Sequence, residues 1–600
     1  MPMAAGTHRI ARFAALAVCG ILMLPVASAA GSPRHDGMRV SAPLPGIDPV
    51  FVYDQLAYMT SHFQRREAGY LTGSAGHAGF ARYWTREMLR LLGSFGARAQ
   101  SDPFRLRGWL GRPATAPGAD LEVTVPGLTD PVREVVIGCH YDGEADSTQS
   151  AYDDASGCAI ELGVARAIGR FWRSNHLYPA RTLRFILFDG EEQGLFGSAY
   201  YVNQFARGDL PYIAAMVNEE QSGIGYPLRY LGRSANALMP TTAWVSPLTR
   251  NPAYANYRIS PAQRTAIVAF RQLVSQAVPA AFAEFRAIGD QMLTYHDRTG
   301  KPVWQPIFTP AQLRYAPVQS DTVGRSDHFL FAEAGVPSLM LLGNFTYYDP
   351  NAPLASFPFD QPTDTVQLMN AFADGGTSPS HALELALALP GMISTWLLPQ
   401  PAVLGAVPAD GRPAAAIGEI GVIRPGRPAR FNVAAAYIPG RPATSLRYAW
   451  RFGDGTAATG TVVRHVFHAP GRYELRLTVS WPGGSTVLAR EVSVGSATTF
   501  TNPYGGALPK GPPALVEALR GVPPPNSSVT APVPSPRLQD QVSTVAQVRR
   551  LTAHARPLTA SSTGMGAGIA IAIAVVILAA FVLVMLLRFR VHPTRRSSGP

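Results

Sequence analysis

The chain has 600 residues, more than one hydrophobic core usually holds, so the sequence predicts several domains. Apolar residues make up 47% and charged residues 15%, which excludes a largely disordered chain and suits a folded protein with a membrane segment. The net charge is +12, but the Arg residues are scattered and no basic helix or RNA-binding signature occurs, so we expect no nucleic-acid partner.

The first 29 residues have the layout of a secretory signal peptide. A basic stretch at residues 8–12 precedes an apolar run at 13–26, and an Ala-Ser-Ala sequence ends at Ala29. Small residues with this spacing are typical of a signal-peptidase site, so we expect cleavage after Ala29. The alternative is an uncleaved membrane anchor.

Residues 45–400 have the pattern of an α/β domain. Two short apolar runs, 135–137 and 183–188, are typical of buried parallel strands, and residues 157–170 between them have helical spacing. These segments predict a strand–helix–strand unit, in which ligands bind at the carboxyl ends of the strands. The spacing predicts further helices at 80–92, 261–293 and 380–397, and further strands at 121–125, 214–217 and 338–342.

Acidic residues and one His follow the ends of these two strands. His140 and Asp142 come after the first strand, Asp153 lies at the start of the helix, and Glu191 and Glu192 come after the second strand. Each could be an ordinary feature, since Asp is a common helix N-cap and a pair of Glu residues is common in a solvated turn. A hydrolytic metal site, however, needs carboxylate or imidazole ligands plus a free base for the water. The three positions in this order therefore favour a metal site.

Three segments resemble motifs of the M28 family of metallopeptidases, the co-catalytic zinc aminopeptidases and their relatives. They are HYD at 140–142, YDDASG at 152–157 and FDGEEQGLFGS at 188–198, and the resemblance covers about residues 50–399. It implies an α/β fold in which helices sandwich a mixed, largely parallel sheet. It also implies two divalent metal ions, expected to be Zn²⁺, and a peptide or protein substrate.

The resemblance also implies a role for each of these residues. His140 would bind one metal ion, Asp153 would bridge both ions, and Glu192 would bind the other. Glu191 would be the general base that takes a proton from the metal-bound water. Asp142 would support the ligands without touching a metal ion itself.

Two later positions depart from the family pattern. Glu220 stands where the family has an Asp ligand, and Asp360 stands where it has a His ligand. Phe359 replaces a Tyr that polarises the substrate carbonyl in some members. His328 lies in another family-like segment whose His is normally not a ligand, and its recruitment as a replacement ligand stays open.

With these departures, the five expected ligands are one His and four carboxylates. Oxygen ligands favour harder ions relative to Zn²⁺ more than imidazole does. We therefore expect one of the two sites to hold zinc weakly or to prefer an ion such as Mn²⁺.

Residues 225–317 form a connection that is longer than is typical of the family. A lid or substrate wall and an inert surface insertion are equally compatible with its composition. The lid interpretation depends on its aromatic residues, which are Tyr226, Tyr230, Trp244, Tyr254 and Tyr257.

The chain contains three Cys residues, and Cys19 lies in the predicted signal peptide. So few Cys residues in an exported chain exclude a disulfide scaffold. Cys139 and Cys158 both lie in the apolar strand–helix–strand unit, so we expect two buried thiols. A single bond between them stays open.

Residues 405–496 contain short alternating runs separated by Gly, Pro and Asp, which is the pattern of a small β-sandwich. The segments YAWRFGDG at 448–455 and HVF at 465–467 resemble those of a PKD domain. This resemblance implies an immunoglobulin-like β-sandwich that serves as a spacer or a binding module. We expect Trp450 to lie in its core.

The remaining sequence predicts a membrane anchor. Residues 501–562 are rich in Pro, Ser, Thr and Ala without periodicity, which is typical of a disordered stalk. Residues 566–587 are an uncharged apolar run long enough to span a bilayer, and residues 588–600 form a basic tail. Because positive charge marks the cytoplasmic side, we expect a single-pass protein of the cell envelope membrane with its catalytic domain on the outer side, periplasmic or extracellular.

The leading interpretation is a membrane-anchored, exported metallopeptidase that acts as an aminopeptidase. One alternative is a non-catalytic scaffold or receptor that keeps the peptidase fold, which Asp360 and Phe359 favour. Another is a glutaminyl-cyclase-like transferase with a single metal site. Retention of Glu191 argues against the scaffold, because a scaffold needs no free base. The sequence predicts neither the oligomeric state nor the preferred substrate residue.

Overall fold

The computed structural model describes residues 45–502, which lie in one compact unit, Leu44–Pro600. The description excludes residues 70–71, 108–114, 146, 224–225, 228–237, 240, 293–317, 323, 344–361, 363, 375–380 and 442–444. The predicted signal peptide, membrane helix, basic tail and all but the first two residues of the stalk lie outside the described residues, as do Phe359 and Asp360. What the sequence predicts for them therefore stays a prediction.

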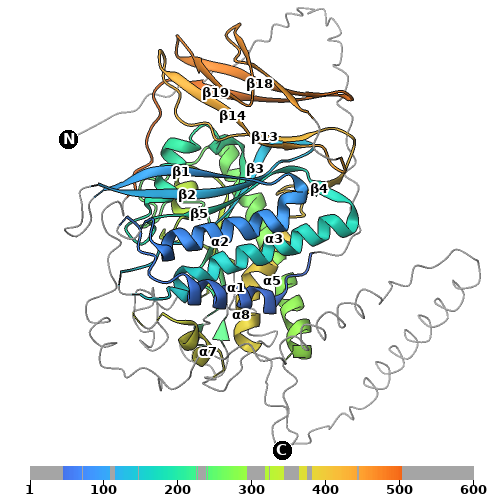
Figure 1. The fold of residues 1–600 in the computed structure, drawn as a ribbon. Helices are drawn as coiled ribbons and strands as arrows, with labels where there is room; N and C mark the ends of the chain where they lie inside the picture. The colour runs from blue at the N-terminus through green and yellow to red at the C-terminus, as the bar shows by residue number, and fades with distance from the viewer. Residues whose placement is uncertain are drawn as a thin grey trace, which may run out of the picture. The chain divides into compact units, whose positions relative to one another are not determined.

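A sheet of eight strands forms the centre of the first domain (Figure 1). In spatial order the strands are β1 (Arg98–Arg107), β2 (Thr115–Val125), β5 (Arg181–Phe188), β3 (Asp130–His140), β6 (Ile213–Glu220), β11 (Ser338–Leu342), β9 (Thr242–Val245) and β10 (Val318–Ser320). The four middle strands, from β5 to β11, are parallel neighbours. The pairs β1–β2, β2–β5 and β11–β9 are antiparallel. This arrangement confirms the predicted mixed, largely parallel sheet.

Apolar sequence explains why the middle strands are buried on both faces. In β3, Val135, Val136 and Ile137 are fully buried, and in β5 the same holds from Leu183 to Phe188. Successive side chains of a strand point to opposite faces, so a run without polar alternation requires helices on both sides of the sheet. The one charged residue inside these runs, Arg184, is fully buried and pairs with Glu122 and Glu134.

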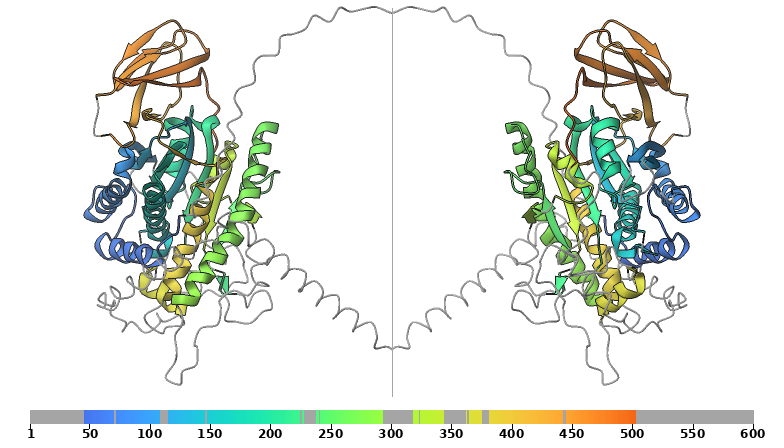
Figure 2. Two further views of the ribbon diagram at one scale, coloured as in Figure 1. Left: turned by 90° about the vertical axis from the view of Figure 1, so that its right-hand side faces the viewer. Right: turned by 90° about the vertical axis from the view of Figure 1, so that its left-hand side faces the viewer.

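Helices cover both faces of this sheet. On one face, α2 (Ala75–Leu92) and α3 (Ser156–Asn175) lie side by side (Figures 1 and 2), and α1 (Pro49–His62) and α8 (His381–Leu397) pack against α3. On the other face, Phe188 and Met216 share a core with residues of α4 (Phe196–Tyr200), η3 (Tyr201–Phe205) and α6 (His328–Glu333). The other helices are η1 (Gly93–Phe95), η2 (Ala151–Ala155), η4 (Leu210–Tyr212), α5 (Pro261–Met292) and α7 (Val366–Asp374).

The long connection at residues 225–317 supplies part of the sheet and of the core. Strand β9 pairs with β11, and Trp244, Tyr254 and Tyr257 are buried. Helix α5 packs along α8 (Figure 2). In the described part of the chain, one segment, Pro261–Phe285 of α5, is long and apolar enough to cross a membrane by length and composition alone.

The second domain consists of two antiparallel sheets around one apolar core. Trp450 is 0% exposed in this core, and its Nε1 donates a hydrogen bond to Gly460 O at 3.0 Å. These sheets confirm the predicted β-sandwich. One sheet has β13 (Ala414–Ile417), β14 (Pro428–Tyr437) and β17 (Val462–Val466), and the other has β16 (Ala457–Thr459), β15 (Arg447–Arg451), β18 (Gly471–Trp481) and β19 (Gly484–Val494). Two small pairs are β4 (Leu177–Pro179) with β12 (Ala406–Pro408), and β7 (Tyr226–Pro227) with β8 (Leu238–Met239).

Candidate metal centre

The carboxyl edge of the central sheet gathers most of the predicted site residues. His140 is the last residue of β3 and Glu220 is the last residue of β6, and these two strands are parallel neighbours. Glu191 and Glu192 lie in the turn after β5, which is the other neighbour of β3. Asp153 lies in η2, the turn that leads into α3. Parallel strands therefore bring together residues that are distant in the sequence.

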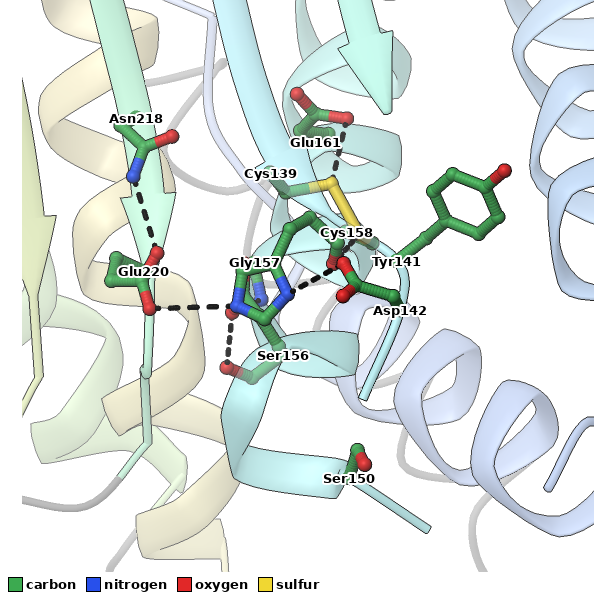
Figure 3. The surroundings of a disulfide bond; sticks show 12 residues. Cys139, Tyr141, Asp142, Ser150, Ser156, Gly157, Cys158, Glu161, Asn218 and Glu220 are labelled. Carbon is green, nitrogen blue, oxygen red and sulfur yellow. Dashed lines mark hydrogen bonds and ion pairs between the residues drawn. A yellow bond between two sulfur atoms is a disulfide. The ribbon is translucent and has the colours of Figure 1, made fainter. Parts of the chain in front are cut away.

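The imidazole of His140 is fully buried and lies among three carboxylates. Its Nε2 is 2.8 Å from Asp153 Oδ1 and 3.7 Å from Glu220 Oε1, while its Nδ1 is 3.4 Å from Asp142 Oδ1. In Figure 3, the labelled residues Glu220 and Asp142 lie on opposite sides of the ring to which dashed lines join them. A metal-binding His commonly directs its second ring nitrogen to a carboxylate. Asp142 takes that position here, so Nε2 is the atom that faces the remaining acids.

Asp142 also connects the end of β3 to the turn after β5. Its Oδ1 accepts a hydrogen bond from the backbone N–H of Glu191, and its Oδ2 accepts one from the backbone N–H of Glu192, each at 3.2 Å. The side chain of Asp142 is 0% exposed, so solvent does not compete for these bonds. One carboxylate thus orients both the imidazole and the turn.

Two overlapping groups place potential metal-binding atoms within 4.8 Å of one another. His140, Asp153 and Glu192 form the first group, and His140, Asp154 and Glu220 form the second. Asp154 is absent from the ligands that the sequence predicted. Its Oδ1 accepts a backbone hydrogen bond at the start of α3, whereas its Oδ2 has no hydrogen-bond partner within the described residues.

His328 lies elsewhere and belongs to neither group. Its Nε2 is 2.7 Å from Asp321 Oδ2, and the hydroxyl of Tyr254 donates a hydrogen bond to the same oxygen. All three side chains are fully buried. The structure therefore pairs His328 with Asp321 in the core and does not bring it to the ligands.

Burial and like charge dominate the electrostatics of the gathered residues. Burial raises the pKa of Glu191 well above its usual range, and the Glu220 carboxylate raises it further against the opposing effect of His140. For His140, burial lowers the pKa, but the carboxylates, with Glu191 the strongest, outweigh it and leave the pKa well above its usual range. The site therefore binds protons strongly, as expected for a buried group of acids that lacks equal positive charge.

This set of donor atoms fits divalent cations. Carboxylate oxygens and one imidazole nitrogen are ligands for Zn²⁺ and for harder ions. The donors His140, Asp153, Asp154, Glu192 and Glu220 are each 5% exposed or less. Burying four carboxylates against one imidazole is costly unless a cation balances them.

Metal affinity is expected to fall as the pH falls. A His ligand must be neutral to bind a metal ion, and the pKa of His140 is raised. When the pH is at or below that pKa, the metal ion therefore has to displace a proton from His140. Affinity should therefore rise with pH and level off once the pH exceeds the raised pKa. Calorimetric Mn²⁺ or Zn²⁺ titrations in buffers of different ionisation enthalpy would measure the released protons. The control His62→Asn, which alters an exposed His, should keep the same slope, and a pH-independent affinity would contradict the assignment.

Arg66 is a buried residue of this region that sequence reasoning missed. It is 0% exposed, and its Nε donates to Tyr141 O at 2.7 Å, its Nη1 to Gln149 O at 2.6 Å and its Nη2 to Ser150 O at 3.0 Å. Burial lowers its pKa to about 10. Arg66 thus joins the segment after His140 to the segment before Asp153. An Arg in no recognisable motif gives no signal of such a role.

Asp364 is the second residue that was missed. Its carboxylate accepts hydrogen bonds from the backbone N–H groups of Tyr152 at 2.6 Å and Asp153 at 3.0 Å. Burial raises its pKa to about 7, although the two N–H groups and Arg66 act in the opposite direction. A signal was present, because Asp364 lies four residues after Asp360 in the family-like segment.

A disulfide between Cys139 and Cys158 corrects the expectation of two free thiols (Figure 3). Cys139 directly precedes His140 in β3, and Cys158 lies in the first turn of α3. Their Cα atoms are 5.4 Å apart, within the range that the bond requires. The bond ties the strand that carries His140 to the helix that follows Asp153. Only the packing of α3 on β3, which the sequence does not reveal, brings the two residues together.

Two segments of the chain match known families. Residues 123–267 match Peptidase family M28, and residues 410–494 match the PKD domain. The chain contains an M28 peptidase domain. His140, Asp153, Glu191, Glu192 and Glu220 all lie within the span that matches the M28 family.

The individual relatives match over short stretches. A probable zinc metalloprotease of Pyrenophora tritici-repentis is 34% identical over 107 residues, which is 17% of this chain and 23% of that protein. One of Pyricularia oryzae is 31% identical over 179 residues, 22% of this chain and 34% of that protein. The matches thus span about a third or less of these curated relatives. Among solved structures, a zinc aminopeptidase from Bacillus subtilis has 12% identity and a TM-score of 0.37, with 60% of this chain and 97% of that chain covered.

Proposed function

We propose that the M28 domain, residues 45–400, is a metallopeptidase that hydrolyses peptide bonds and acts as an aminopeptidase. The main support is the convergence of His140, Asp153 and Glu192, whose potential ligand atoms lie within 4.8 Å of one another. The buried Glu191 lies in the same turn as Glu192. A scaffold without activity would need neither the ligands nor the adjacent base.

The proposal assigns the ligands of two divalent cations. His140, Asp153, Glu192 and Glu220 would hold them, and Asp360 is a fifth predicted ligand outside the described residues. Because carboxylates predominate, we propose that one position prefers a harder ion such as Mn²⁺ to Zn²⁺. When bound, the cations supply an activated water and polarise the scissile carbonyl.

The protein's own residues carry the proton. The Glu191 carboxylate accepts a proton from the water and donates it to the nitrogen of the leaving amine. Asp142 keeps the backbone of Glu191 in place and orients the imidazole of His140.

We also propose that the protein is exported and anchored in the cell envelope membrane, with the peptidase domain on the outer side. The supporting features are the signal-like residues 1–29 and the apolar residues 566–587, followed by a basic tail. The bond between Cys139 and Cys158 suits a compartment where thiols become oxidised.

One assay tests the proposed activity. The purified chain is stripped with a chelator, and Zn²⁺, Mn²⁺ or Co²⁺ is added back with aminoacyl p-nitroanilide substrates. Metal-dependent release of nitroaniline is the expected result. Cyclisation of an N-terminal Gln without hydrolysis would favour the glutaminyl-cyclase-like alternative, and bound metal with neither activity would favour the scaffold. Elemental analysis that finds two tightly held zinc ions would contradict the preference for a harder ion.

A further inference from the structure

The segment after the last strand of the PKD domain returns to the peptidase domain. Residues 495–502, which we call the strap, follow β19. The side-chain amide of Asn203 pairs with both backbone groups of Phe500, accepting from its N–H at 2.8 Å and donating to its O at 3.0 Å. The guanidinium of Arg207 lies 4.5 Å from the centre of the Phe500 ring. The strap is thus held at Phe500 by a polar and a cation–π contact.

The end of the strap contacts the turn that carries the proposed base. Asn502 Nδ2 donates to Gly194 O at 2.7 Å and lies 3.5 Å from Leu195 O. In the same turn, the backbone N–H groups of Gly194 and Leu195 donate to Glu191 O at 2.8 Å and 2.9 Å. Asn502 therefore binds the carbonyl of the Gly194–Leu195 peptide group, and the N–H of that same group donates to Glu191 O.

This turn needs support from outside. Leu195 has a φ of +56°, a left-handed conformation that costs free energy for a residue with a side chain, and Gly194 has a φ of +114°. Asp142 binds the N–H groups at the start of the turn, and Asn502 binds carbonyl groups at its end. The turn is thus clamped at both ends.

The PKD domain fixes the position from which the strap starts. Arg490 of β19 is 3% exposed and lies 2.6 Å from Asp209 and 3.5 Å from Glu134. The hydroxyl of Tyr212 exchanges hydrogen bonds with the backbone of Glu491, accepting from its N–H at 2.7 Å. Buried ion pairs of this kind are specific in geometry. They give the strap a defined start, in contrast to a domain that acts only as a spacer.

We propose that the strap positions the Glu191 turn, with Asn502 as a positioning residue for peptide hydrolysis. The inference rests on the proposed function and adds that the PKD domain is part of the catalytic unit. Loss of the Asn502 amide would let the turn relax, so that the Glu191 carboxylate would spend less time at the attacking water. Substrate binding, which depends on other contacts, would change little. Glu192, a proposed metal ligand, lies in the same turn, so kcat has to be compared at saturating metal.

The test compares full-length variants by hydrogen–deuterium exchange and by kinetics. Asn502→Ala and the shape-matched Asn502→Asp both remove the amide donor. Asn175→Ala is the control, because Asn175 also donates to a backbone carbonyl, Phe171 O at 2.8 Å, at the far end of α3. For both Asn502 variants we expect faster exchange at residues 190–197 and, at saturating metal, a kcat lowered about tenfold with unchanged KM. The control should match the unaltered protein.

A double-mutant cycle shows whether the effect passes through the base. In a Glu191→Gln background, Asn502→Ala should lower the residual rate no further. If Asn502→Ala lowers the rate in this background by the same factor as in the unaltered protein, the role through Glu191 is overturned. Unchanged exchange at residues 190–197 would overturn the clamp itself. Faster exchange with unchanged kcat would overturn the role in hydrolysis. If the unaltered chain shows no turnover, the proposed function fails with the catalytic part of this inference, while the exchange data still decide whether Asn502 holds the turn.

Discussion

Glu191→Gln is expected to keep the bound metal and to lower kcat about 10³-fold. The side chain keeps its size in a site where Glu191 is 5% exposed, and the backbone N–H that donates to Asp142 is unchanged. What is lost is the group that can accept a proton from the water. KM should change little, because the amide still fills the same space.

Three measurements on the same preparation would check this expectation. Elemental analysis gives the metal content, thermal unfolding gives the stability, and steady-state kinetics with an aminoacyl p-nitroanilide gives kcat and KM. Glu87→Gln, which alters a Glu paired with Arg90 on the surface of α2, is the matched control and should leave all three unchanged. Near-normal turnover by Glu191→Gln would remove Glu191 from the role of base.

Arg66→Met is expected to lower the free energy of unfolding by about 3 kcal/mol and to weaken metal binding. Met fills similar space but leaves the carbonyl groups of Tyr141, Gln149 and Ser150 buried without their donor. These carbonyls flank the segments that carry His140 and Asp153, so the two ligands should lose their fixed separation. Arg66→Lys should recover little, because one ammonium group cannot reproduce the planar set of donors.

Urea unfolding and metal titration of the two Arg66 variants would measure these effects. Arg90→Met is the control, since Arg90 lies on the surface and pairs with Glu87. Stability and metal affinity equal to those of the unaltered protein in Arg66→Met would show that water or neighbouring groups replace the guanidinium. An intermediate result for Arg66→Lys alone would instead show that charge, and not geometry, is what the site requires.

Local patterns explain which parts of the fold could be predicted. The runs that became β3 and β5 are short, apolar and followed directly by acids, so the strands and the edge where His140 and Glu191 lie were predictable. The strand β9 was not, because four residues inside a long connection carry no period that separates a strand from a loop. Its burial depends on pairing with β11, which comes much later in the chain.

The contacts around the proposed ligands could not be predicted in the way that the ligands were proposed. His140 and Glu192 belong to motifs with a recognisable spacing. Arg66 and Asn502 act through backbone groups of distant segments, and a backbone carbonyl or N–H has no sequence signature. Such contacts become visible only when the chain is folded, although both side chains are ordinary polar residues in the sequence.

The bond between Cys139 and Cys158 makes a covalent ring of the chain segment between them, and Asp142 and Asp153 lie within that ring beside His140. A ring of this size lowers the conformational entropy of the unfolded chain by an amount worth about 3 kcal/mol. An oxidised chain that has lost its fold thus keeps three site residues within a short loop, and refolding need not find their proximity by diffusion. In a reduced chain, these residues have to come together again each time the protein refolds. Recovery of metal binding after denaturation should therefore be faster and more complete for the oxidised protein than for the reduced one.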